Sequence, residues 1–135
     1  MKTIIHSFLI ALLMTFGSCV TSVMFPVSQI APAADGVAKI KRDKNNNYQI
    51  DLSVKHLSNP ERLTPSRLYY VVWVETDQGS TKNIGRLVSN PSNRGSLKTS
   101  TAFNPVQIFI TAEEDGDVTW PGNMEIFRTP SFRVK

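Results

Sequence analysis

The stretch Leu68-Tyr69-Tyr70-Val71-Val72-Trp73-Val74-Glu75-Thr76 decides the fold of this chain. It is the longest run of β-branched, aromatic and other apolar residues outside the N-terminus, and it stops at the turn signal Asp77-Gln78-Gly79. Residues of these types suit a pleated surface, so the stretch predicts a central β-strand. Apolar side chains fall on both faces, and alternation alone therefore does not say which face meets the core.

Six or seven further strands are predicted around this one. The clearest is residues 48–55, in which apolar and polar side chains alternate, as they do in a half-buried strand. A second strong strand covers residues 105–112, and shorter ones cover residues 24–30, 36–42, 82–88, 97–102 and 124–128. Two prolines make a helix in residues 58–67 unfavourable. The fold class we expect is all-β, an antiparallel immunoglobulin-like β-sandwich of seven to eight strands.

Length and composition limit the possible functions. The 135 residues suit one domain, and 41% apolar residues are enough for a core. The formal charge of +4 falls to +3 without Lys2, which is too weak and dispersed to indicate a nucleic-acid partner. Cys19 is the single cysteine, so no disulfide can form within the chain. No cofactor is expected.

The N-terminus has the plan of a secretory signal peptide. Lys2 precedes an apolar run from Ile4 to Phe16, and Gly17-Ser18-Cys19 follows. Two small residues directly before a cysteine resemble the lipobox of bacterial lipoproteins, although Phe16 stands where that family prefers Leu. The resemblance implies that residues 1–18 are a removed leader and that Cys19 is lipidated. We then expect residues 19–22 to be a short tether and residues 23–135 to form the β-sandwich domain.

Two other interpretations of the N-terminus stay open. Ala31-Pro32-Ala33 also fits a conventional cleavage site, and Ile4–Phe25 is nearly long enough for an uncleaved membrane helix. Under the lipoprotein interpretation, Val20 takes the place of the Asp that favours retention at the inner membrane. We therefore expect a lipid anchor in the bacterial cell envelope, at the periplasmic face of the outer membrane.

A second resemblance concerns residues 68–122. Tyr70-Val71-Val72-Trp73-Val74, Ile84-Gly85-Arg86-Leu87, Phe109-Ile110-Thr111-Ala112-Glu113, Gly116 and Pro121-Gly122 resemble, in order and spacing, the extracytoplasmic C-terminal domain of anti-sigma-K factors, as found in small single-domain bacterial lipoproteins. The resemblance implies a β-sandwich outside the cytoplasm. Full members also carry a cytoplasmic sigma-binding domain, whereas Met1 here leads straight into the leader, so we expect no direct sigma-factor binding.

Few residues suggest chemistry. His56 is the only histidine beyond the leader, and no nucleophile with an orienting carboxylate accompanies it in the sequence, so we expect no enzyme. Glu113, Asp115 and Asp117 lie in an acidic turn that is a weak candidate for a cation site. Lys39, Lys41, Arg42 and Lys44 form a basic hairpin, which either protects a sheet edge or contacts phospholipid headgroups or another polyanion.

The aromatic residues Tyr69, Trp73 and Phe109 supply the remaining candidate site. We expect Tyr70, Val72 and Val74 to face the core, and these three side chains then lie on the opposite face of their strands. Either a loop or the N-terminal segment covers them, or they form an exposed face for a ligand or partner. The function we expect is that of a non-enzymatic, membrane-anchored envelope lipoprotein with a binding, sensing or structural module, whose partner is an envelope protein or glycan. The alternative is a small-ligand or carbohydrate-binding module that uses the Trp73/Phe109 face.

Overall fold

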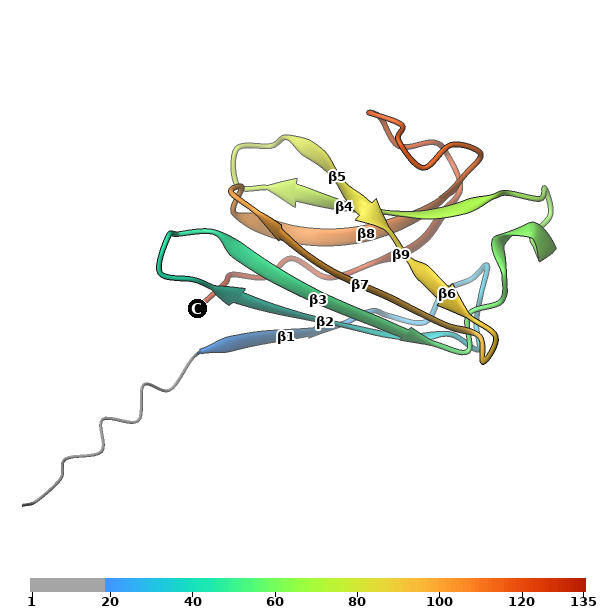
Figure 1. Cartoon of the computed structure of the whole chain (residues 1–135), viewed down its shortest axis with the longest axis horizontal. Helices are drawn as coiled ribbons and strands as arrows, with labels where there is room; N and C mark the ends of the chain where they lie inside the picture. The colour runs from blue at the N-terminus through green and yellow to red at the C-terminus, as the bar shows by residue number, and fades with distance from the viewer. Residues whose placement is uncertain (1–18) are drawn as a thin grey trace, which may run out of the picture.

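Two antiparallel sheets face each other in the computed structural model, which describes residues 19–135 (Figure 1). The first sheet contains, in spatial order, β1 (Val20–Met24), β2 (Asp35–Arg42), β3 (Tyr48–Lys55), β7 (Arg94–Thr101) and β6 (Val88–Asn90). The second contains β5 (Thr81–Arg86), β4 (Tyr69–Thr76), β8 (Pro105–Glu113) and β9 (Glu125–Arg128). The predicted antiparallel β-sandwich is confirmed, with nine strands in place of seven or eight. The proposed leader, residues 1–18, lies outside the described residues.

The opening stretch forms β4, between β5 and β8 in the second sheet. Its two faces are both buried, for different reasons. Tyr70, Val72 and Val74 join the main core between the sheets, as predicted, whereas Val71 and Trp73 belong to a separate small cluster on the outer face. The alternating apolar residues of β3 and β8 supply much of the main core, and β2 and β9 add Ala38, Ile40, Ile126 and Phe127. This double burial explains why the run is apolar on both sides.

Tyr70 ties β4 to the loop that precedes it. Its hydroxyl donates a hydrogen bond of 2.7 Å to the carbonyl oxygen of Ser58. Burial raises the pKa of Tyr70 to about 12, although the bond to Ser58 works in the opposite direction. The loop itself contains a short 3-10 helix, Pro60–Arg62, which Asn59 caps by accepting a hydrogen bond from the backbone N–H of Glu61.

The N-terminal segment differs from expectation. The predicted tether, residues 19–22, is wrong, because β1 begins at Val20 and pairs with β2 from Val20↔Lys41 to Met24↔Val37. The edge strand predicted over residues 24–30 is shifted accordingly. The helix considered over Ile4–Phe25 is wrong at its C-terminal end, since residues 20–24 form β1, and its residues 4–18 lie outside the described range. Within residues 19–135, no helix is long and apolar enough to cross a membrane.

The residues after β1 belong to the core. The ring of Phe25 packs on that of Phe127 from β9, with centroids 5.2 Å apart, and Phe25 is buried. The backbone of Gly36 lies directly against the Phe25 ring, where a Cβ would be only 2.7 Å from the ring carbon Cδ2. At the other end of the chain, the backbone N–H of Lys135 donates to the Thr21 hydroxyl at 3.1 Å. The C-terminal segment thus joins β1 to the second sheet.

Candidate functional site

The structure brings the three predicted aromatic side chains together on one face of the second sheet. Trp73 and Phe109 lie opposite each other on β4 and β8, and their rings stack with centroids 6.1 Å apart and planes 13° from parallel. The two side chains are 0% and 3% exposed, respectively. Tyr69 lies further along β4 and is half-buried against them. Of the two alternatives left open by the sequence, the structure shows the covered one.

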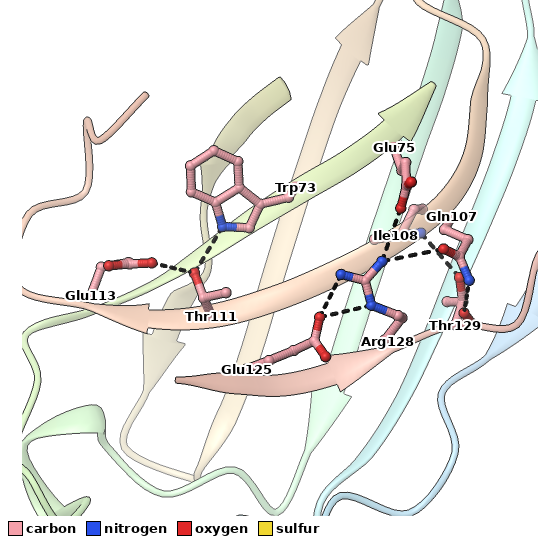
Figure 2. A network of polar contacts seen from close by, with 9 residues as sticks. All are labelled: Trp73, Glu75, Gln107, Ile108, Thr111, Glu113, Glu125, Arg128 and Thr129. Atoms are coloured by element: carbon pink, nitrogen blue, oxygen red, sulfur yellow. Dashed lines mark hydrogen bonds and ion pairs between the residues drawn. The ribbon is translucent and has the colours of Figure 1, made fainter. Parts of the chain in front are cut away.

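A chain of hydrogen bonds fixes the position of the Trp73 side chain (Figure 2). The indole N–H of Trp73 donates to the Thr111 hydroxyl at 2.8 Å, and that hydroxyl donates to a carboxylate oxygen of Glu113 at 2.7 Å. The same carboxylate oxygen accepts the backbone N–H of Gly122 at 2.7 Å. Because each group polarises the next, such a chain is stronger than its separate bonds. It ties the end of the β8–β9 loop to the sheet.

The β8–β9 loop, residues 114–124, is held over the outer face of the second sheet. The side-chain amide of Asn83, on β5, donates to the carbonyl oxygens of Gly116 and Val118 at 3.2 and 2.8 Å. Its oxygen accepts the backbone N–H of Gly85 at 2.9 Å. Val118 packs on the Trp73 cluster. This loop therefore covers the tryptophan.

Arg86 clamps the same loop. Its guanidinium lies over the Tyr69 ring, 4.9 Å from the centroid, and pairs with Asp117 at 3.6 Å. Gly116 is buried against the Arg86 side chain, where any Cβ would collide with it. Glycine at this position thus permits the loop to approach the arginine closely.

A second arginine covers the other end of the aromatic pair. The Arg128 guanidinium lies over the Phe109 ring, 4.1 Å from its centroid. It also binds Glu75, Glu125 and Gln107, with the Glu75 contact at 3.0 Å (Figure 2). With the loop on one side and this arginine on the other, the Trp73/Phe109 face offers no surface to a ligand. The predicted alternative of an exposed aromatic binding face is wrong.

The other predicted candidates are not brought together. His56 is an exposed residue just after β3 with a φ of 57°, and among residues 19–135 its side chain makes no hydrogen bond. Glu113 turns inward to Thr111 and Gly122, whereas Asp115 accepts a bond from the backbone N–H of Asp117 at 2.9 Å. No group of three metal-ligating side chains occurs within the described range. Glu113 and Asp115 hold the backbone of the acidic turn through these hydrogen bonds.

The basic residues of the β2–β3 hairpin separate into two pairs. Arg42 lies over the Tyr48 ring at 5.7 Å, and Lys44 stands in the turn that the Asp43 carboxylate closes. Lys39 and Lys41 instead project from the outer face of the first sheet. There they line a groove of about 570 Å³ together with Val20, Asp51, Lys98 and Ser100. We call this feature the lysine groove.

The lysine groove carries a net positive charge. Asp51 pairs with Lys98 at 4.0 Å, and both side chains are largely exposed, so this contact is weak. Lys39 and Lys41 have no carboxylate partner among residues 19–135. The sequence analysis found Lys39 and Lys41 but missed Lys98. Only the pairing of β3 with β7, which sets Asp51 opposite Lys98, brings that residue to the groove.

The lysine groove borders the proposed site of lipidation. Val20, which lines it, is the first residue of β1 and follows the exposed Cys19 directly. Consecutive Cα atoms are about 3.8 Å apart, so Cys19 lies at the margin of the groove. Figure 1 shows β1 at the edge of the first sheet, on the side of the molecule away from the β8–β9 loop.

No protein-family model, curated protein or solved structure matches this chain. The resemblance to the anti-sigma-K domain therefore stays a prediction. Its residues have clear structural roles here: Trp73, Thr111, Glu113 and Gly122 form the hydrogen-bonded chain, and Arg86 with Gly116 clamps the loop. In this chain, the residues that carry the resemblance close the outer face of the second sheet.

Proposed function

We propose that this protein is a non-enzymatic lipoprotein of the bacterial envelope, whose acylated Cys19 holds a β-sandwich binding module at the periplasmic face of the outer membrane. The observation that carries the proposal is that β1, the first strand of residues 19–135, begins at Val20, the residue after Cys19. A leader removed before Cys19 leaves every strand of these described residues intact. Several acyl chains on one residue anchor a protein stably, whereas a single chain does so only marginally.

The structure counts against conventional cleavage after Ala33. That cut would remove β1 and with it the buried side chains of Thr21 and Val23. It would also remove Phe25, whose loss from the core costs about 3–5 kcal/mol by comparison with other buried Phe→Ala changes. Such a loss is large beside the 5–15 kcal/mol that stabilises a typical domain. Cleavage before Cys19 keeps β1 and the buried Phe25 in the domain, which supports the lipobox interpretation.

Binding is the activity that the surface supports. The Trp73/Phe109 face is closed, so the carbohydrate-binding alternative has lost the surface on which it depended. The lysine groove is open, charged and next to the anchor, which makes it the candidate surface for an envelope partner. We propose no sigma-factor binding, and no catalytic step is assigned to His56.

Labelling with palmitate tests the anchor. The wild-type chain, expressed in a bacterium, is expected to incorporate the label, and Cys19→Ser is expected to incorporate none. Cys19→Ser/Ser22→Cys is the matched control, because it restores an exposed cysteine three residues away, within β1. Label in this control equal to the wild type, or label in Cys19→Ser, would contradict a lipobox at residue 19.

A further inference from the structure

The lysine groove is lined by three lysines, Lys39, Lys41 and Lys98, and by one carboxylate, that of Asp51. Lys39 and Lys41 are two residues apart on β2, so their Cα atoms are about 6.6–6.8 Å apart on the same face. Lys98 is two strands away, in the cross-strand row Ser22–Lys39–Asp51–Lys98. Strands are spaced by about 4.8 Å, which puts Lys98 about 10 Å from Lys39. Long lysine side chains can converge on one anionic group across that distance.

The apolar side chains beside the groove are unusual for a solvent-facing strand. Val20 is 47% exposed and Met24 is 72% exposed, and both project from the outer face of β1. A face with a basic strip beside exposed apolar side chains is suited to the boundary between lipid headgroups and acyl chains. The strand that presents this apolar edge starts at the residue after Cys19.

We propose that the lysine groove binds the phosphate of anionic phospholipid headgroups in the leaflet that holds the acyl chains of Cys19. Lys39, Lys41 and Lys98 contact the phosphate, and Val20 and Met24 contact the lipid beside it. The first sheet then lies on the bilayer, and the β8–β9 loop faces away from it. The choice of a membrane surface over a soluble polyanion rests on the proposed anchor, since an anchored Cys19 holds the groove at the headgroups.

Vesicle binding tests the groove without the anchor. The full chain carrying Cys19→Ser is mixed with vesicles of phosphatidylcholine alone or with added phosphatidylglycerol, and bound protein is measured by co-sedimentation. We expect tighter binding to the phosphatidylglycerol vesicles. Each lysine near an anionic surface contributes about 1 kcal/mol, so Lys39→Gln/Lys41→Gln should weaken that binding roughly 30-fold. Binding to the phosphatidylcholine vesicles measures the contribution of the leader residues, and the variants are compared by the increase that phosphatidylglycerol causes above it.

The control variant removes the same charge from elements outside the first sheet. Arg62→Gln/Lys82→Gln changes two exposed residues, one in the 3-10 helix Pro60–Arg62 and one on β5 of the second sheet. We expect it to keep most of the phosphatidylglycerol-dependent binding. Equal loss in both variants, or no preference for phosphatidylglycerol in the parent chain, would overturn the headgroup site. Retained helical or strand content is checked by circular dichroism, and all four positions are exposed enough to tolerate glutamine.

Two further measurements separate the possible failures. Dextran sulfate is the soluble probe: if the lysine pair is needed for dextran sulfate but not for vesicles, the occupant is a soluble polyanion and the membrane proposal is overturned. Palmitate labelling of the wild type reports the anchor independently. A labelled chain whose Cys19→Ser form shows no lipid preference overturns the headgroup site alone. An unlabelled chain whose groove still binds phosphatidylglycerol overturns the anchor alone and keeps the site.

Discussion

The indole N–H of Trp73 donates a 2.8 Å hydrogen bond to the hydroxyl of Thr111, and both side chains are buried. The Thr111 hydroxyl in turn donates a hydrogen bond to the Glu113 carboxylate. The hydrogen-bonded chain connects Trp73 to the β8–β9 loop, and this loop covers the indole ring. The cover explains why a large aromatic residue lies on the outer face of the second sheet. The role of Trp73 in this protein is to hold the β8–β9 loop.

Thr111→Val should therefore destabilise the domain by about 2 kcal/mol, because it leaves a buried indole N–H without its partner and removes one donor from the Glu113 carboxylate. Urea unfolding measures the difference in the free energy of unfolding. Thr99→Val on β7 is the control, since its half-buried side chain makes no hydrogen bond within the described residues, and it should change stability by less than about 0.5 kcal/mol. Equal effects of the two substitutions would show that the hydrogen bonds of Thr111 contribute nothing to the stability of the domain.

Loss of the Asn83 side chain should open the loop. In a Trp120→Phe background Trp73 is the only tryptophan, and iodide should hardly quench its fluorescence. Asn83→Ala removes both bonds to the carbonyl oxygens of Gly116 and Val118 and should increase quenching and hydrogen exchange in residues 114–124. Asn123→Ala, within the loop itself, should change neither. Strong quenching of Trp73 in the background chain would mean that the face is open after all.

Tyr70→Phe tests the role of the buried phenol through the pH dependence of the free energy of unfolding. With the pKa raised from 10.0 to about 12 in the folded state, the unfolded chain deprotonates first as pH rises. The wild type should therefore lose stability from about pH 10 to pH 12, by at most about 2 kcal/mol, whereas Tyr70→Phe lacks this step. At pH 8 the variant should be less stable by about 1 kcal/mol, because the bond to Ser58 is gone. A gap between the two proteins that stays constant up to pH 12 would contradict this account.

Phe25→Ala tests whether the segment before Ala33 belongs to the fold. The buried ring packs on Phe127, so its removal should cost about 3 kcal/mol in urea unfolding. Val27→Ala is the matched control two residues on: Val27 is 79% exposed, and its truncation should cost less than about 0.5 kcal/mol. A small effect of Phe25→Ala would reopen the possibility that the chain is cut after Ala33.

Local pattern was sufficient for most of the strands. The alternation in residues 48–55 matches the buried and exposed positions of β3, and the split of Tyr70, Val72 and Val74 from Trp73 on β4 is also as predicted. β1 was predicted too late in the chain, over residues 24–30, because its residues continue the apolar composition of the leader and no change in pattern marks its start. β6 has only three residues and no buried side chain, and such a strand leaves no periodic signal.

The candidate sites depended on contacts between distant residues. Whether Trp73 is covered follows from Asn83 reaching Gly116 and Val118, more than thirty positions away, and side-chain periodicity carries no information about such bonds. The lysine groove likewise required the register of β3 against β7. The sequence showed which residues share a face of one strand. It did not show which face a loop covers, or which residues of neighbouring strands meet.

The central claim is that the mature chain begins at an acylated Cys19 and folds from Val20 onward. Intact mass and N-terminal fragment spectra of the protein isolated from the bacterial envelope measure this directly. We expect a chain whose first residue is Cys19 with acyl chains on it. A mature chain that begins at residue 34, or one in which Cys19 keeps a free thiol, would contradict it.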